Sequence, residues 1–183
     1  MLRLVAPILS LYKPPLNVVL GGVETLSPTD VLVAQIIEYL TEYDIIDWAN
    51  DYASSHPELE SESTLFEILR LNRKRKDEVA KVPELLCRFV SQHEPDFDSH
   101  SAIAEDRARQ LFNARLKDYL DEQCTPWAVC KMISPIEQHY DFPSWLGNMY
   151  NACDWIEPTM TPVNCRHLEI EIKEHLIAFD HTS

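Results

Sequence analysis

Apolar residues recur at spacings of three and four along most of the chain, which is the pattern of amphipathic helices. The longest such stretch covers residues 101–122, where the apolar positions would share one side of a helix about 33 Å long. These positions are Ala104, Ala108, Leu111, Phe112, Leu116, Tyr119 and Leu120. Shorter stretches are residues 33–40, 45–53, 64–72, 79–92, 143–153 and 162–179. The pattern predicts an all-α fold, a compact array of about seven to nine helices.

Four Ser-Pro or Thr-Pro dipeptides mark predicted helix starts. They are Ser27-Pro28, Thr125-Pro126, Ser134-Pro135 and Thr161-Pro162. The hydroxyl can cap the first free backbone N–H groups, and proline is tolerated at the first helical position because no N–H is needed there. Glu137 would complete a capping box with Ser134. Asp44 is expected to be the N-cap of a further helix.

Residues 1–26 break the helical pattern with three prolines and the Gly21-Gly22 pair. We expect an irregular or extended segment that packs on the helical body, and a single domain over residues 1–183. The opening apolar run is short and precedes Tyr-Lys-Pro-Pro instead of a small-residue cleavage site, so a secretion signal is not expected. Nor does any run of about 20 apolar residues predict a membrane span.

The chain is acidic, with 30 Asp and Glu against 16 Lys and Arg and a net charge of −14. Such a charge repels nucleic acid and anionic membranes, so we expect neither as a partner. It favours a basic protein partner, or it serves only solubility. The one basic run, residues 70–76, lacks aromatic residues for base stacking and is expected to be a solvated helix end. Alternatively, it docks an acidic partner or the chain's own Glu58, Glu60 and Glu62.

An acidic patch is predicted where two consecutive helices meet. Its members are Glu38, Glu42, Asp44, Asp47 and Asp51. The last three are spaced by three and four residues and therefore share one helical side. Together the five carboxylates would steer a cationic protein into contact. The alternative is the ordinary polar face that any amphipathic helix carries.

The chain has five cysteines, and none belongs to a Cys-x-x-Cys pair. An odd number leaves one thiol over in a full disulfide framework, so reduced thiols in the cytoplasm are predicted. Four of the five cysteines and three of the four tryptophans fall within residues 124–168. Because thiols and large rings are usually buried, this block is expected to be core.

Metal and catalytic chemistry have weak support in the sequence. The thiol and imidazole groups of the block are Cys124, Cys130, Cys153, Cys165, His139 and His167, and only Cys165 and His167 have a spacing close to that of zinc ligands. Cys124 is the best-placed thiol for nucleophilic catalysis, since it precedes a helix start. Neither Glu-x-x-His nor Gly-x-Ser-x-Gly occurs in the chain. We therefore predict no catalytic residue, no metal and no cofactor.

Aromatic and ionisable residues of the same block are candidates for a pocket or a binding anchor. They are Trp127, His139, Tyr140, Asp141, Trp145, Tyr150, Asp154 and Trp155. Trp145, Tyr150 and Trp155 cannot all point to one side of a helix, so an exposed one would be a binding anchor. Full burial of all three rings is the expectation.

The most consistent interpretation is a cytoplasmic, non-enzymatic protein that binds a basic protein, for example an inhibitor or immunity-type protein. The competing hypothesis is a small-ligand-binding protein or enzyme with an aromatic pocket in residues 127–155. A zinc-stabilised module is the third.

Overall fold

The computed structural model of the chain describes residues 26–59 and 63–180. These residues form ten α-helices and three short 3-10 helices, and they contain no strand. The all-α prediction is confirmed. Three of the ten α-helices have five residues or fewer, so the longer ones number seven. The predicted extended segment, residues 1–26, lies outside the described residues except for Leu26, as do Glu60 and Glu62.

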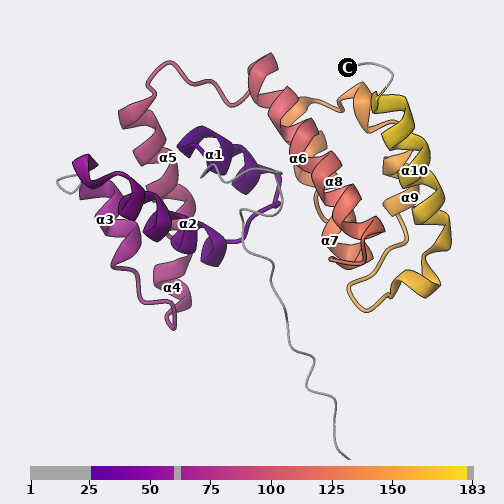
Figure 1. The fold of residues 1–183 in the computed structure, drawn as a ribbon, viewed down its shortest axis with the longest axis horizontal. Helices are drawn as coiled ribbons and strands as arrows, with labels where there is room; N and C mark the ends of the chain where they lie inside the picture. The colour runs from indigo at the N-terminus through magenta and orange to yellow at the C-terminus, as the bar shows by residue number, and fades with distance from the viewer. Residues whose placement is uncertain (1–25, 60–62, 181–183) are drawn as a thin grey trace, which may run out of the picture.

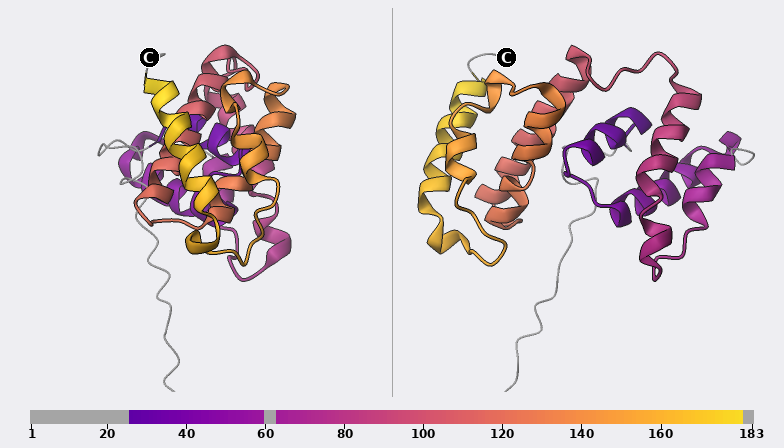
Figure 2. Two further views of the ribbon diagram at one scale, coloured as in Figure 1. Left: turned by 90° about the vertical axis from the view of Figure 1, so that its right-hand side faces the viewer. Right: turned by 180° about the vertical axis from the view of Figure 1, so that it is seen from behind.

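The helices form two groups that lie side by side (Figures 1 and 2). The first group is α1 (Pro28–Ile36), α2 (Glu42–Ser55), α3 (Ser63–Leu69), α4 (Lys76–Val79) and α5 (Val82–His93), with a 3-10 turn at Pro57–Leu59. The second is α6 (Ala102–Leu120), α7 (Pro126–Cys130), α8 (Ile133–Tyr140), α9 (Met149–Cys153) and α10 (Arg166–Asp180), with 3-10 turns η3 (Ser144–Leu146) and η4 (Pro162–Asn164). An extended stretch joins α5 to α6.

Helix α1 is the member of the first group that lies against the second, and it packs on both α5 and α6. Its Val31 and Ala34 are fully buried, because one side faces each group. Polar contacts tie the groups together as well. The Arg107 guanidinium of α6 donates two hydrogen bonds of 2.7 and 2.8 Å to the Asp30 carboxylate of α1. The two groups therefore share one continuous core around α1.

Local capping explains where several helices begin. Ser27 and Asp30 form a capping box at the start of α1, and Thr125 caps α7, as the Ser/Thr-Pro pattern predicts. The predicted N-cap of α2 is wrong. Thr41 is the N-cap, and Asp44 is the third helical residue, whose carboxylate accepts from the Thr41 backbone N–H at 2.9 Å.

Two other predicted helix starts are wrong. Helix α8 begins at Ile133, so Ser134-Pro135 lies inside its first turn, and the Ser134 hydroxyl accepts from Gln138 instead of capping. Thr161-Pro162 opens the 3-10 turn η4, and α10 begins only at Arg166. Helix α8 has thus begun before Ser134, and Thr161-Pro162 starts a 3-10 turn that ends at Asn164, before α10.

No helix in the described part of the chain is both long enough and apolar enough to cross a membrane.

Candidate functional site

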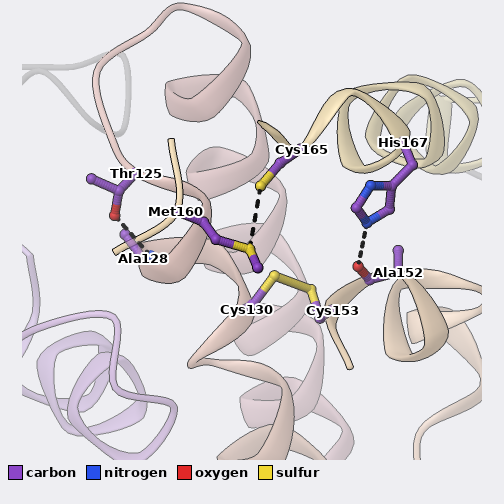
Figure 3. The surroundings of a disulfide bond; sticks show 8 residues. All are labelled: Thr125, Ala128, Cys130, Ala152, Cys153, Met160, Cys165 and His167. Carbon is purple, nitrogen blue, oxygen red and sulfur yellow. Dashed lines mark hydrogen bonds between the residues drawn. A yellow bond between two sulfur atoms is a disulfide. The ribbon is translucent and has the colours of Figure 1, made fainter. Parts of the chain in front are cut away.

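A disulfide joins Cys130, at the end of α7, to Cys153, at the end of α9 (Figure 3). Their Cα atoms are 5.1 Å apart. The prediction of five reduced thiols is therefore wrong for these two residues. The prediction of a cytoplasmic location depended on reduced thiols. That support is lost, because disulfides persist mainly in oxidising compartments. Cys87, Cys124 and Cys165 are free thiols.

The chain around the disulfide is fixed by further contacts (Figure 3). Cys165 is buried, with its sulfur 4.0 Å from that of Met160. The Nε2 atom of His167 lies 3.2 Å from the Ala152 carbonyl oxygen. Cys165 and His167 thus have different partners, and the described residues contain no group of three side chains that could hold a metal. The structure gives no support to the zinc hypothesis in this part of the chain.

Trp155 is on the surface, with 81% of its area exposed. It lies two residues beyond Cys153, and the next residue, Ile156, is buried and donates its backbone N–H to the Cys153 carbonyl at 3.1 Å. The chain is therefore held on both sides while the indole faces solvent. The expectation that Trp145, Tyr150 and Trp155 are all buried is wrong, because Tyr150 is 43% exposed as well.

Exposed carboxylates flank Trp155 in the chain. Asp154 and Glu157 are its exposed near neighbours in the chain, and Tyr150 lies one helical turn before Asp154. Glu137 comes from α8, which packs on α9. Burial raises the pKa of Glu137, and the negative charge of Asp154 adds to this. None of the three carboxylates has an ion pair within the described part of the chain. We call this set, Glu137, Tyr150, Asp154, Trp155 and Glu157, the Trp155 surface.

The acidic patch predicted on α2 is not a set of free surface carboxylates. Asp44 is 7% exposed and serves the α2 cap, so its inclusion is wrong. Asp47 accepts two hydrogen bonds, of 2.6 and 3.1 Å, from Arg73. Only Glu38, Glu42 and Asp51 remain of the five predicted carboxylates. Of these, Glu38 lines a groove together with Trp127.

The basic run at residues 70–76 supplies partners to carboxylates of the same chain. Arg73 reaches Asp47, and Arg75 pairs with Asp77 at 2.7 Å and with Glu78 at 3.1 Å. Glu58, one of its predicted partners, has no ion pair with it among the described residues. No local pattern predicts the contact between Arg73 and Asp47, because 26 residues separate the two partners.

The predicted pocket residues are spread over several places. Trp127 and His139 line a groove of about 640 Å³ together with Glu38 and Lys131. Trp145 lines a different cavity, and its indole N–H donates to Glu105 at 3.0 Å. The structure therefore does not bring Trp127, Trp145 and Trp155 to one pocket.

The remaining predicted pocket residues contact the chain itself. The Tyr140 hydroxyl donates to the Ala104 carbonyl at 3.2 Å. His139 stacks on His100 with ring centroids 4.0 Å apart, and its Nε2 lies 3.0 Å from the Ser99 carbonyl oxygen. Burial lowers the pKa of His139. Asp141 is exposed and ends α8 in the left-handed conformation, with φ +51°. These contacts fasten α8 to the start of α6.

Cys124 is poorly suited to nucleophilic catalysis. Burial raises the pKa of its thiol to about 11, so the thiol stays protonated at neutral pH. The reactive form of cysteine is the thiolate. Cys124 lies instead against the Arg115 carbonyl, with sulfur and oxygen 3.8 Å apart.

Comparison with known proteins finds no matching family model, no matching curated protein and no matching solved structure. Function is therefore inferred from the geometry of this chain.

Proposed function

We propose that this protein is a non-enzymatic interaction module that binds a basic protein through the Trp155 surface. The observation that carries the proposal is the 81% exposure of Trp155, between chain segments that are themselves fixed. Tryptophan is among the residues that contribute most to protein interfaces, because it removes a large area from water with few rotatable bonds.

The surroundings of the ring favour a cationic partner group. An arginine or lysine over the face of an indole gains a cation–π interaction. Asp154 and Glu157 flank the ring in the chain, and the charge of Asp154 acts on Glu137. Each of the three carboxylates lacks a cation of its own within the described residues. A guanidinium that stacks on Trp155 could therefore form a salt bridge at the same time.

The disulfide prepares this surface for binding. Cys153 is fixed to α7 two residues before the indole. A preorganised anchor loses less conformational entropy on association than one on a mobile loop. The net charge of −14 would also speed the encounter with a cationic protein. An inhibitor or immunity-type protein that neutralises a cationic toxin would use such a surface.

The experiment is affinity capture from the source cells, followed by binding measurements with the purified partner. We expect Trp155→Ala to weaken binding about 30-fold or more, as for an interface hot spot. Asp154→Asn should weaken it less and should reduce its dependence on salt. Ile170→Ala is the matched control, because Ile170 is also exposed but lies outside the Trp155 surface. Equal affinity of the wild type and Trp155→Ala for every captured partner would refute the proposal.

A further inference from the structure

A second site, separate from the Trp155 surface, lies between α6, α10 and the η3–α9 segment. It is a cavity of about 410 Å³, within the range of roughly 300–1,000 Å³ typical of small-ligand sites. Trp145, Met149 and Phe179 supply its apolar lining, and Arg109, Glu171 and Glu174 supply charges. We propose that this cavity binds a small zwitterion with an apolar side chain, of the class of the hydrophobic α-amino acids.

The aromatic lining is held in place by polar contacts. The Trp145 indole N–H donates to Glu105 of α6 at 3.0 Å. The Arg109 guanidinium lies 5.0 Å from the centre of the Phe179 ring, and it donates to Asp106 at 2.5 Å through one terminal nitrogen. The other guanidinium nitrogens remain available to a ligand carboxylate. The two rings are thus fixed beside a cation that is only partly neutralised.

The opposite charge comes from α10. Glu171 and Glu174 line the cavity, and neither has an ion pair or side-chain hydrogen bond within the described residues. The pair on this helix that does form, Lys173 with Glu169, uses neither of them. The cavity therefore presents two unpaired carboxylates from one helix and a guanidinium from another.

His175 adds a hydrogen-bonding group to the cavity, and a contact with Asn113 fixes the orientation of its ring. It lines the cavity, and its Nε2 lies 3.1 Å from the Oδ1 atom of Asn113 on α6. Asn113 is only 3% exposed, and its Nδ2 atom has no partner in the described part of the chain. With Nε2–H donating to the amide, the lone pair of the ring is on Nδ1. Most buried polar groups in proteins have a hydrogen-bond partner, so the unpartnered Asn113 amide nitrogen calls for an explanation.

A zwitterion is the ligand that matches this arrangement. A simple anion would face Glu171 and Glu174, and a simple cation would face Arg109. A neutral apolar molecule would offer no partner to the unpaired Glu171 and Glu174 carboxylates and none to the free guanidinium nitrogens of Arg109, which is unfavourable. An α-amino acid can place its carboxylate on Arg109, its ammonium near Glu174 and His175, and its side chain against Trp145 and Phe179.

The test is calorimetric titration of the full chain with L-phenylalanine, L-methionine and L-leucine. We expect saturable binding of at least one of them. L-phenylalaninamide lacks the carboxylate and N-acetyl-L-phenylalanine lacks the ammonium, so each should bind at least about tenfold more weakly than L-phenylalanine. Saturable binding of the analogues with equal affinity would overturn the zwitterion assignment, and no binding of any amino acid at millimolar concentration would overturn the site.

Single substitutions test whether a loss of ligand binding comes from the cavity itself or from damage to the fold. Arg109→Gln and Glu174→Gln should each weaken binding about tenfold or more. Glu174 is exposed, so its replacement leaves the core untouched. Arg166→Gln and Glu169→Gln are matched controls on α10 outside the cavity lining, and they should leave the affinity unchanged. Equal affinities of Glu174→Gln and Glu169→Gln would contradict the proposal. Trp155→Ala should bind the amino acid normally, so failure here is distinct from failure of the proposed interaction surface.

Discussion

The two groups of helices differ in where each places a tryptophan and in the charges near that tryptophan. In α1–α5 the indole of Trp48 faces inward and stacks on Tyr52 with ring centroids 4.9 Å apart, and Tyr43 is the exposed ring of this group, at 40%. Several charges there are paired within the chain, as in Arg88, which contacts both Glu67 and Glu84. In α6–α10 the indole of Trp155 is uncovered, and the carboxylates near it lack cations in the described residues. In our proposal, a binding surface is marked by unpaired charge beside an exposed ring, and less by net charge.

Two tryptophans give the strongest test of this difference. Trp48 is buried and donates its indole N–H to the Leu26 carbonyl at 2.8 Å. We expect Trp48→Ala to lower the free energy of unfolding by about 3–5 kcal/mol, because it leaves a cavity in the core. Trp155→Ala should change it by no more than about 0.5 kcal/mol. Urea denaturation followed by circular dichroism measures both, and similar losses for the two variants would remove the contrast.

The sequence predicts most of the fold because the signals are local. The apolar spacing of residues 101–122 matches α6, and Ser27 and Thr125 cap helices as their dipeptides indicate. Helix periodicity and capping both depend on residues within about four positions of one another, so they can be read before any tertiary contact is known.

The candidate sites were harder to predict because they depend on contacts between distant residues. Cys130 and Cys153 are 23 positions apart and meet only because the ends of α7 and α9 do. Asp47 is not a free carboxylate of an acidic patch, because Arg73 pairs with it, and no local pattern reveals this contact. For Trp155 one signal was present. Carboxylates flank it at positions 154 and 157, next to Pro158, a composition that suits a surface turn better than a core.

Removal of the disulfide should have the next largest effect on stability. The disulfide also distinguishes the groups, because the first group has none among its described residues. Replacing both Cys130 and Cys153 by serine should lower the free energy of unfolding by about 2–4 kcal/mol, as the unfolded chain is no longer constrained. Cys87→Ser is the control, since this thiol is exposed and free. Reductant should destabilise the wild type by a similar amount and leave the double variant unchanged. A wild type that is insensitive to reductant would contradict the expectation.

The ion pair between Arg107 and Asp30, which joins the two groups, should contribute less to the free energy of unfolding than the disulfide does. Arg107 and Asp30 are more buried than Arg73 and Asp47, with side-chain exposures of 30% and 22% against 47% and 51%. We expect Arg107→Ala to cost about 1 kcal/mol of unfolding free energy, and Arg73→Ala about 0.5 kcal/mol or less, since water screens the more exposed pair. Thermal denaturation at low and high salt should show the larger salt dependence for the Arg73 pair. The reverse ranking would mean that the Arg107–Asp30 pair contributes little to holding the groups together.

The smallest expected effect is a loss of stability in acid, and it should come from a histidine in α6–α10. Burial lowers the pKa of His175 there, so its folded-state pKa lies below that of the unfolded chain. Well above the ordinary histidine pKa of about 6.5, the group is neutral in both states and does not affect stability. Below that value the unfolded chain takes up a proton that the folded chain excludes, so the free energy of unfolding falls. His175→Gln should therefore lose less stability than the wild type between about pH 7.5 and 5.5. Urea denaturation at these two values measures the loss, and parallel curves above about pH 7.5 are the internal control. Equal losses in the two proteins would show that the buried imidazole does not contribute to acid sensitivity.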